Sequence, residues 1–279
     1  MKKILVTTDF SINSKVGIRF AYQLSLQQNV VLTFLHVAHI SKPTGWSDDK
    51  YTNFENKELK RFEMELQAFV SSVYLGMDAK LQNVKYVVIN HPNSSTGIMQ
   101  YAKQHGMDFI CISTRGAGII KKLLGTHSSE IINKSEVPVI VIPKQYRRAK
   151  LNHVVYATDL ENIENELNNV MEFSKYFDAK TEILHFNEPA DHNKAERVMN
   201  DLIEHHKHEN IRVIVRPVNY IDTLLTNIKS AVKIIKPSLL VTFTHKNQSL
   251  IDKLCDAGIS SGYSFDAQVP LLVYRKEKG

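Results

Sequence analysis

Short runs of apolar residues alternate along this chain with longer segments in which apolar residues recur every three or four positions. The runs are continuously apolar, which is typical of strands buried on both faces of a parallel sheet. Within residues 14–28, Val16, Phe20 and Leu24 recur at spacings of four and predict an amphipathic helix. Strands that alternate with helices predict an α/β fold with right-handed crossovers.

Two further helices are expected in the first half of the chain. Residues 56–74 carry apolar side chains at spacings of three and four, namely Leu59, Phe62, Leu66 and Val70. Residues 94–105 begin with serine and threonine, whose hydroxyl groups can cap a helix. The polar segment 41–53, which contains the single tryptophan Trp46, is expected to be an exposed loop.

The chain repeats itself. Thr8-Asp9 and Thr158-Asp159 each follow an apolar run, and Leu35-His36 in the first half matches Leu184-His185 in the second. An internal repeat of this length indicates that the same structural unit occurs twice in the chain. The sequence therefore predicts two doubly wound Rossmann-like domains, each with a five-stranded, mostly parallel sheet. The matching pairs are 2–11 with 152–161, 31–40 with 180–189, 84–90 with 211–219, 107–115 with 237–246, and 137–144 with 269–276.

The basic segment "KQYRRAK" (144–150) lacks apolar periodicity and is expected to link the two domains, which we place at residues 1–146 and 150–279. The last strand of each half, "VPVIVIP" and "VPLLVY", is apolar and needs covering at the sheet edge. Pairing of these strands would make an intramolecular pseudo-dimer. A homodimer of the whole chain stays open.

Composition narrows the classes of function. The chain has 279 residues, 43% of them hydrophobic, with a net charge of +6. This excess permits an anionic ligand, and no basic patch interleaved with aromatic residues points to nucleic acid. No apolar stretch is long enough to cross a membrane, and Asp9 interrupts the first run too early for a signal peptide. Cys111 and Cys255 are expected to be buried reduced thiols, so we expect a cytoplasmic protein with no membrane partner.

Polar residues gather where ligands bind in open α/β sheets, at the carboxyl ends of the strands. Asp9 follows the first strand, Val37 and Ala38 follow the second, and "STRGAGIIKKLLGTHSS" (113–129) follows the fourth. Neither a Walker A motif nor a dinucleotide fingerprint is present.

The stretch 113–129 has the chemistry of a phosphate loop. Gly116 and Gly118 let the backbone turn and direct N–H groups toward an anion, and Gly125 permits close approach at the start of a helix. The hydroxyl residues that follow can cap this helix, whose N-terminus attracts phosphate. They are Thr126, Ser128 and Ser129, and Lys121 and Lys122 add positive charge nearby.

These segments together resemble the universal stress protein family. The loop is similar to the family signature G-x2-G-x9-G-[ST], and "ILVTTDFS" and "LHV" (35–37) are similar to the family's first and second strands. The resemblance covers the whole chain as a tandem pair of domains. It implies an α/β, cytoplasmic, often dimeric protein from a family with ATP-binding and non-binding branches.

The resemblance also implies a site for ATP or another adenine nucleotide, alone or with Mg²⁺. Ser113 stands where the signature has its first glycine, and the loop is one residue shorter than the signature, which Gly118 can absorb. The implied contacts are Thr7, Thr8 and Asp9 at the ribose or adenine, Val37 at the adenine, Gly116, Gly125 and Thr126 in the phosphate loop, and His127 and Ser128 beside the phosphates.

The second half departs further from the signature. Ala257 replaces the closing glycine and Gly258 replaces the hydroxyl residue, so this half is expected not to bind ATP in the family's manner. Asp159 is then expected to be a turn or cap residue, with a different ligand left open.

Other polar residues have plainer interpretations beside the functional ones. The plainer interpretation of Asp9 is that it caps the following helix and binds no ligand. His36 and His185 are expected to be strand-end or core histidines rather than catalytic groups. His205 with His208 or Glu209 can share a helix face and bind a metal, although a polar helix surface is the favoured interpretation.

The function expected from the sequence is that of a nucleotide-binding stress-response regulator or sensor rather than a fast enzyme, with slow ATP hydrolysis at most. A slow ATPase and an interaction scaffold that binds no nucleotide are the alternatives. The sequence contains no GxSxG hydrolase motif, and no paired carboxylates stand out, so neither feature favours an enzyme.

Overall fold

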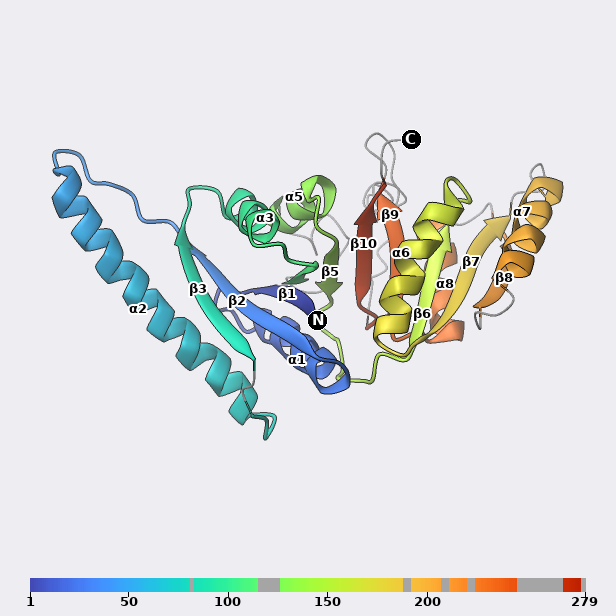
Figure 1. The fold of residues 1–279 in the computed structure, drawn as a ribbon, viewed down its shortest axis with the longest axis horizontal. Helices are drawn as coiled ribbons and strands as arrows, with labels where there is room; N and C mark the ends of the chain where they lie inside the picture. Colours follow the sequence, from blue (N-terminus) through green and yellow to red (C-terminus); the bar gives the residue numbers. More distant parts are fainter. Residues whose placement is uncertain are drawn as a thin grey trace.

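The strands of the protein form one continuous sheet of ten strands. The computed structural model describes residues 1–80, 83–114, 126–187, 192–206, 211–219, 224–244 and 268–276. The strand order is β3-β2-β1-β4-β5-β10-β9-β6-β7-β8, so the first half of the chain builds one half of the sheet and the second half builds the other (Figure 1).

Each half contains five parallel strands, as the repeats predict. The first half contains β1 (Lys2–Thr7), α1 (Ser14–Gln27), β2 (Val30–Ala38), α2 (Asp48–Leu75), β3 (Val84–Asn90), α3 (Ser94–Gln104), β4 (Phe109–Ser113), α5 (Thr126–Lys134) and β5 (Val139–Ile142). The second contains β6 (His153–Thr158), α6 (Ile163–Tyr176), β7 (Lys180–Asn187), α7 (His192–His205), β8 (Ile211–Pro217), α8 (Leu224–Ile235), β9 (Leu239–Thr244) and β10 (Leu271–Arg275). Two doubly wound α/β halves are thus confirmed.

The last strands of the two halves pair with each other. β5 and β10 run antiparallel, with Leu272 opposite Ile140. This covers the two apolar edges in the way that the sequence predicts. All other neighbouring strands are parallel. The strands of the first half therefore have their carboxyl ends on one side of the sheet, and those of the second half have theirs on the opposite side.

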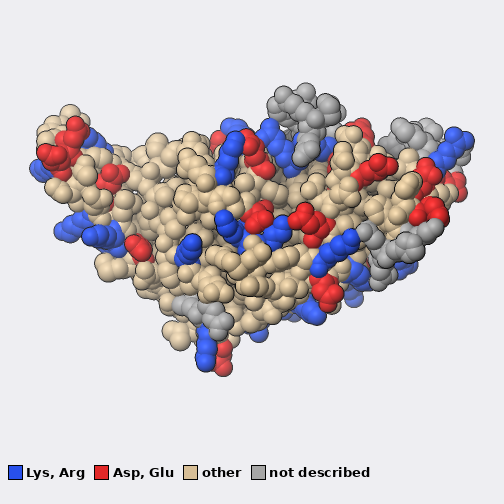
Figure 2. All heavy atoms as spheres, in the orientation of Figure 1, with Lys and Arg blue, Asp and Glu red and all other residues tan. Residues whose placement is uncertain are grey.

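Side chains from both halves reinforce the junction. The Lys2 ammonium lies 2.7 Å from the Glu172 carboxylate, and the rings of Phe109 and Phe173 meet edge to face with centroids 5.3 Å apart. The Gln27 side-chain amide at the end of α1 binds both backbone groups of Leu151, with its nitrogen 2.9 Å from the carbonyl and its oxygen 2.8 Å from the N–H. Basic and acidic side chains are interspersed over the middle of the face in Figure 2.

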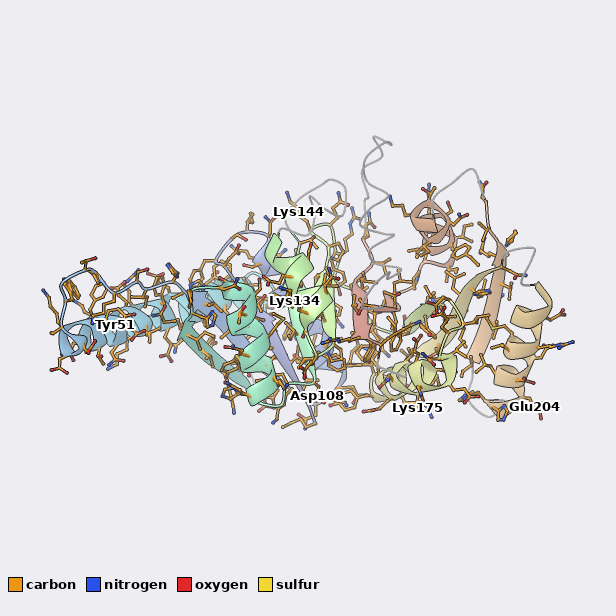
Figure 3. All side chains as sticks on the ribbon, turned by 90° about the horizontal axis from the view of Figure 1, so that it is seen from above. Tyr51, Asp108, Lys134, Lys144, Lys175 and Glu204 are labelled. Atoms are coloured by element: carbon orange, nitrogen blue, oxygen red, sulfur yellow. The ribbon has the colours of Figure 1, made fainter. Side chains whose placement is uncertain are left out.

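Helices cover both faces of the sheet. One hydrophobic cluster joins α1, α2, α6 and α7 to the sheet and runs across both halves. A second cluster lies on the other face under α3, α5 and α8. Asp108 and Lys134 lie near the junction of the halves, whereas Tyr51 on α2 lies near the far end of the molecule (Figure 3).

Two helix starts differ from the sequence-based prediction. α2 begins at Asp48 and not at residue 56, so the expectation that residues 41–53 form a loop is wrong for 48–53. Ser47 caps the helix by accepting from Lys50 N–H, and Asp48 and Asp49 suit its positive end. This first part of α2 contains no buried residue, so apolar periodicity could not reveal it. In α3, the capping side chain is Asn93 and not a hydroxyl residue.

Cys111 is a free, fully buried thiol, and burial raises its pKa. Cys255 lies outside the described residues. Within the parts of the chain that the structure describes, no helix has the length and apolar character needed to cross a membrane.

Candidate functional site

The turn after β1 is built by its own side chains. The Thr8 hydroxyl accepts from Phe10 N–H at 3.1 Å and lies 2.8 Å from the Ser14 hydroxyl at the start of α1. The Asp9 carboxylate accepts from Ser11 N–H at 3.0 Å, as aspartate does in an Asx turn. Phe10 sits at φ 60°, a left-handed conformation that is rare for a bulky residue. Together these contacts fix Asp9 on the surface at the end of β1.

His36 ties the end of β2 to this turn. Its Nδ1–H donates to the Thr8 carbonyl at 2.9 Å, and burial lowers the pKa of the ring. The ring also packs against Phe10, with centroids 4.2 Å apart. Val37 follows and is half-buried. His36 is therefore a neutral strand-end histidine with a structural hydrogen bond, in agreement with the plainer interpretation.

The end of β4 supplies the third part of the site. Ser113 is the last residue of this strand, and its hydroxyl accepts from Gly17 N–H in the first turn of α1 at 3.0 Å. A methyl group at residue 17 would lie 2.6 Å from the Ser113 oxygen, so the close approach of helix and strand requires glycine. Ser113 thus joins β4 to the N-terminus of α1. Thr7, the remaining residue implied here, donates to the Cys111 carbonyl at 3.5 Å.

The strand register brings these three ends level. Thr7 lies opposite Leu35 and Val6 lies opposite Cys111, so the end of β1 with the turn that contains Asp9 lies level with Val37 on β2 and Ser113 on β4. The chain runs from β1 outward through β2 to β3 and then crosses back to β4 on the other side of β1. This reversal is the switch point at which α/β sheets bind ligands.

The predicted phosphate loop falls mainly outside the described residues. Gly116, Gly118 and Gly125 lie there, as do Lys121 and Lys122, and the side chains of Thr126 and His127 are likewise undescribed. α5 begins at Thr126, so Thr126, His127 and Ser128 form its first turn instead of preceding it. The N–H groups of a first helical turn have no partner within the helix, and this turn contains no acidic residue.

The second half repeats the turn almost contact for contact. The Thr158 hydroxyl accepts from Leu160 N–H at 2.9 Å, and Asp159 accepts from Glu161 N–H at 3.0 Å. Leu160 sits at φ 68°, and the His185 Nδ1–H donates to the Thr158 carbonyl at 3.1 Å. The backbone conformation is therefore a property of the repeated Thr-Asp sequence and not of one site.

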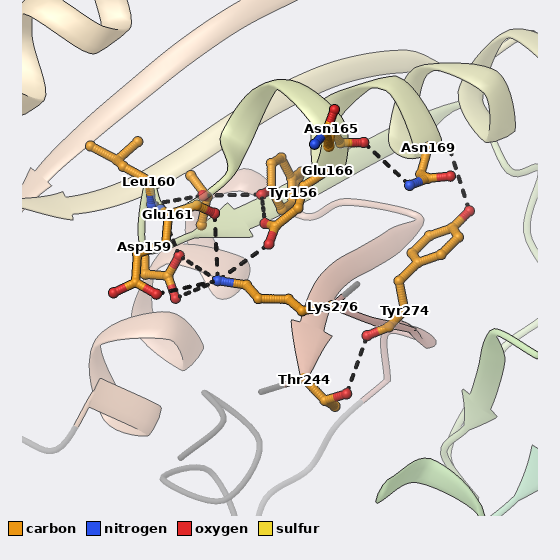
Figure 4. Close-up of polar contacts among 11 residues, drawn as sticks. Tyr156, Asp159, Leu160, Glu161, Asn165, Glu166, Asn169, Thr244, Tyr274 and Lys276 are labelled. Carbon is orange, nitrogen blue, oxygen red and sulfur yellow. Dashed lines mark hydrogen bonds and ion pairs between the residues drawn. The ribbon is translucent and has the colours of Figure 1, made fainter. Parts of the chain in front are cut away.

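The two turns differ in the side chains that contact them. In the second half, the Lys276 ammonium lies 3.0 Å from both carboxylate oxygens of Asp159 and 3.2 Å from the Glu166 carboxylate (Figure 4). It also lies 3.5 Å from the carbonyl oxygen of Glu161. The side chains of Lys276 and Glu166 are only 6% and 5% exposed. This contact agrees with the expectation that Asp159 is structural.

Glu166 is the buried centre of this cluster. Tyr156 donates its hydroxyl to Glu166 and also contacts the Thr158 hydroxyl at 3.1 Å. Burial raises the pKa of Glu166 to about 7, although the Tyr156 hydrogen bond and the Lys276 ammonium both favour the ionised form. Burial and the neighbouring carboxylate also raise the pKa of Tyr156.

Sequence reasoning missed this cluster, although the repeat carried its signal. Aligned through the Thr-Asp turns, Tyr156 and Glu166 stand where the first half has Val6 and Val16, both buried. A change from apolar to polar at two buried positions of a repeat marks a new interaction. The alignment of the last strands likewise matches Lys276 to Lys144, which is exposed.

The histidine pair considered for a metal gains no support from the described residues. His205 ends α7, and its Nδ1–H donates to the Asp201 carbonyl at 2.8 Å. His208 and Glu209 lie outside the described residues. Across the described ranges, no group of three or more histidine, cysteine, aspartate or glutamate residues is placed to hold a metal.

Comparison with known proteins agrees with this architecture. The universal stress protein family matches residues 1–143. A universal stress protein from Archaeoglobus fulgidus DSM 4304 superposes with a TM-score of 0.64 at 18% identity, over 98% of this chain and 96% of that one. A candidate universal stress protein from Pseudomonas aeruginosa UCBPP-PA14 superposes with a TM-score of 0.59 at 11% identity, over 99% and 93%. No curated protein matches the chain.

The two solved structures, at these identities, show the fold alone, in which both halves of the chain take part. The family match extends from the start of β1 through β5 and so includes the complete first half of the sheet. The chain therefore belongs to the universal stress protein family.

Proposed function

We propose that the first half binds ATP or another adenine nucleotide, alone or with Mg²⁺, at the carboxyl edge of β2, β1 and β4. The protein then acts as a regulator or sensor in a stress response, and its second half acts as a partner domain in a pseudo-dimer. The observation that carries this proposal is the level placement of the Asp9 turn after β1, Val37 on β2 and Ser113 on β4 at the switch point.

The residues present suit the parts of a nucleotide. The exposed Asp9 carboxylate is an acceptor suited to a ribose hydroxyl or an adenine amine, and Val37 offers an apolar contact for the base. The first turn of α5, without acidic residues, presents N–H groups that suit phosphate. Mg²⁺ would enter with the phosphates, since it is commonly held by one or two carboxylates together with substrate phosphates.

The same geometry favours binding over turnover. His36 and Thr8, two described groups at this edge that could move a proton, are engaged in holding the turn. His36 donates to the Thr8 carbonyl, and the Thr8 hydroxyl is shared with Ser14 and Phe10 N–H. A general base must reach the proton that it removes, and these atoms face the protein's own backbone.

Release of copurified nucleotide tests the proposal. The purified protein is denatured and the supernatant is analysed for adenine nucleotides by liquid chromatography and mass spectrometry. We expect bound nucleotide in the natural protein and its loss in Gly125→Val, because a side chain there blocks close approach to the phosphates. The matched control is Ala257→Val, at the equivalent place in the second half, which should leave the bound nucleotide unchanged.

Two other results would change the conclusion. No released nucleotide, together with no binding of ATP in a calorimetric titration, would contradict the proposal and favour a scaffold. Steady phosphate release from ATP, abolished by Gly125→Val, would favour an ATPase instead.

A further inference from the structure

In the second half, a buried lysine is bound by a buried glutamate and an exposed aspartate, and the described residues of the first half contain no equivalent arrangement. The polar groups around this lysine are the Asp159 carboxylate, the Glu166 carboxylate and the Glu161 carbonyl, which come from the turn after β6 and from α6. The Lys276 ammonium enters from the end of β10. A lysine that lies 117 residues from Asp159 in the sequence therefore meets carboxylates from the turn after β6 and the first turn of α6 (Figure 4).

Burial of these charges is costly unless each is matched. Removal of an ammonium or carboxylate from water costs several kcal/mol, which close opposite charges must offset. Here the ammonium lies within 3.2 Å of two carboxylates, and Tyr156 donates a further hydrogen bond to one of them. The arrangement is therefore a matched site whose cation belongs to the chain itself.

The first half cannot form this site. Val6 and Val16 occupy the positions of Tyr156 and Glu166 and are buried, so they offer no charge or hydrogen bond to an entering ammonium. Lys144, the counterpart of Lys276, stays exposed. Because the two turns have the same backbone, side chains alone decide whether a lysine is received.

We propose that Lys276 is an internal ligand of the second half, bound at the Thr158–Asp159 turn in the place where the first half takes the ribose or adenine of a nucleotide. Lys276 is then the residue that limits the chain to one nucleoside site. This inference rests on the proposed function for the identity of the excluded ligand. The place of Lys276 itself does not depend on it.

The first experiment tests that place without any nucleotide. The natural protein is treated with a trace of acetic anhydride, and acetylation of each lysine is followed by mass spectrometry. We expect Lys276 to react at least about tenfold more slowly than Lys144, because its amine is buried and paired. Equal rates for the two lysines would overturn the proposal.

The second experiment tests whether Lys276 excludes a ligand. Adenosine is the probe, because the loop of the second half lacks the glycine that a phosphate would need. In calorimetric titrations we expect one adenosine per chain for the natural protein and two for Glu166→Val/Lys276→Met. The double change removes both charges together, so neither is left buried alone. The control Lys144→Met should bind one.

The outcomes separate the two proposals. One adenosine per chain in the folded double variant would overturn the role of Lys276 in exclusion. No binding of ATP or adenosine by the natural protein would instead contradict the proposed function, and the acetylation rates would still decide where Lys276 lies.

Discussion

The turns after β1 and β6 have the same backbone and the same local hydrogen bonds but different surroundings. In each, a threonine hydroxyl and an aspartate carboxylate accept from nearby backbone N–H groups, and a histidine from the next strand donates to the threonine carbonyl. Among the described residues, the second turn alone has a tyrosine and a glutamate beneath it, Tyr156 and Glu166, together with the buried Lys276. The comparison shows that a repeated turn is a scaffold whose role is decided by a few neighbouring side chains.

This difference in surrounding side chains predicts that the second turn contributes mainly to folding stability and the first mainly to ligand binding. In the second half, the buried side chains of Glu166 and Lys276 form an ion pair beneath the turn, and Lys276 also reaches the exposed Asp159. In the first half, the positions equivalent to Tyr156 and Glu166 are the buried apolar residues Val6 and Val16. We therefore expect changes at the second turn to alter mainly folding stability, and changes at the first to alter mainly ligand binding.

The largest expected effect comes from the buried lysine. Lys276→Met should lower the free energy of unfolding by about 3 kcal/mol, because it leaves the Glu166 and Asp159 carboxylates without their cation. Lys144→Met, at the exposed equivalent position, should change it by less than about 0.5 kcal/mol. Urea unfolding followed by circular dichroism measures both.

A second substitution tests whether the uncompensated Glu166 carboxylate causes this loss of stability. Adding Glu166→Val to Lys276→Met should restore about 1–2 kcal/mol, because the uncompensated buried carboxylate is then also removed. Equal losses for Lys276→Met and Lys144→Met would show that the second turn is not held by its lysine.

An intermediate effect is expected from pH. The pKa of Glu166 is raised by burial from its ordinary 4.5 to about 7, so the folded protein holds this proton more tightly than the unfolded chain. The stability that Glu166 contributes is complete below pH 4.5 and is lost as the pH rises through 7. Glu166→Gln mimics the neutral form and should flatten the fall in urea midpoint over this interval.

The control for this prediction is Glu161→Gln, which removes an exposed carboxylate from the same turn and should follow the natural protein. All three proteins contain the same histidines, so only the difference between the curves reports on Glu166. Parallel curves for Glu166→Gln and the natural protein would contradict the assignment.

The smallest effect is expected at the contact between α1 and β4. Gly17→Ala places a methyl group 2.6 Å from the Ser113 oxygen and should cost about 1 kcal/mol, although alanine is normally the better helix former. The double variant Gly17→Ala/Ser113→Ala should recover part of this loss, because the clashing oxygen is gone, although the residue 17 N–H also loses its acceptor. Thermal unfolding of the natural protein and the two variants provides the test, and stabilisation by Gly17→Ala alone would disprove the close contact.

Much of the fold follows from the sequence because its signals are local and repeated. Continuous apolar runs predict the strands, and matching runs in two halves predict the tandem α/β architecture and the pairing of "VPVIVIP" with "VPLLVY". The start of α2 was missed because its first turns bury no residue and so show no periodicity. Apolar patterns report burial, and a helix outside the core gives no such signal.

The candidate site was only partly predictable. The turn residues Thr8 and Asp9 were found through the repeat, but the role of Ser113 as a partner of the α1 backbone was not. That contact depends on a glycine on one element that faces a hydroxyl on another, 96 residues apart. Lys276 was missed for a similar reason, since only the folded sheet brings it to Asp159, which is 117 residues away.

One of the two equivalent turns is proposed to bind a nucleotide, whereas the other is filled by the chain itself. Native mass spectrometry after equilibration with ATP distinguishes the two turns, on the natural protein, Asp9→Asn and Asp159→Asn. Asparagine can still accept from the backbone N–H that each aspartate holds, so the turns persist. We expect one nucleotide per chain, lost in Asp9→Asn and kept in Asp159→Asn. Two nucleotides per chain, or loss in Asp159→Asn alone, would show that the turns do not differ in this way.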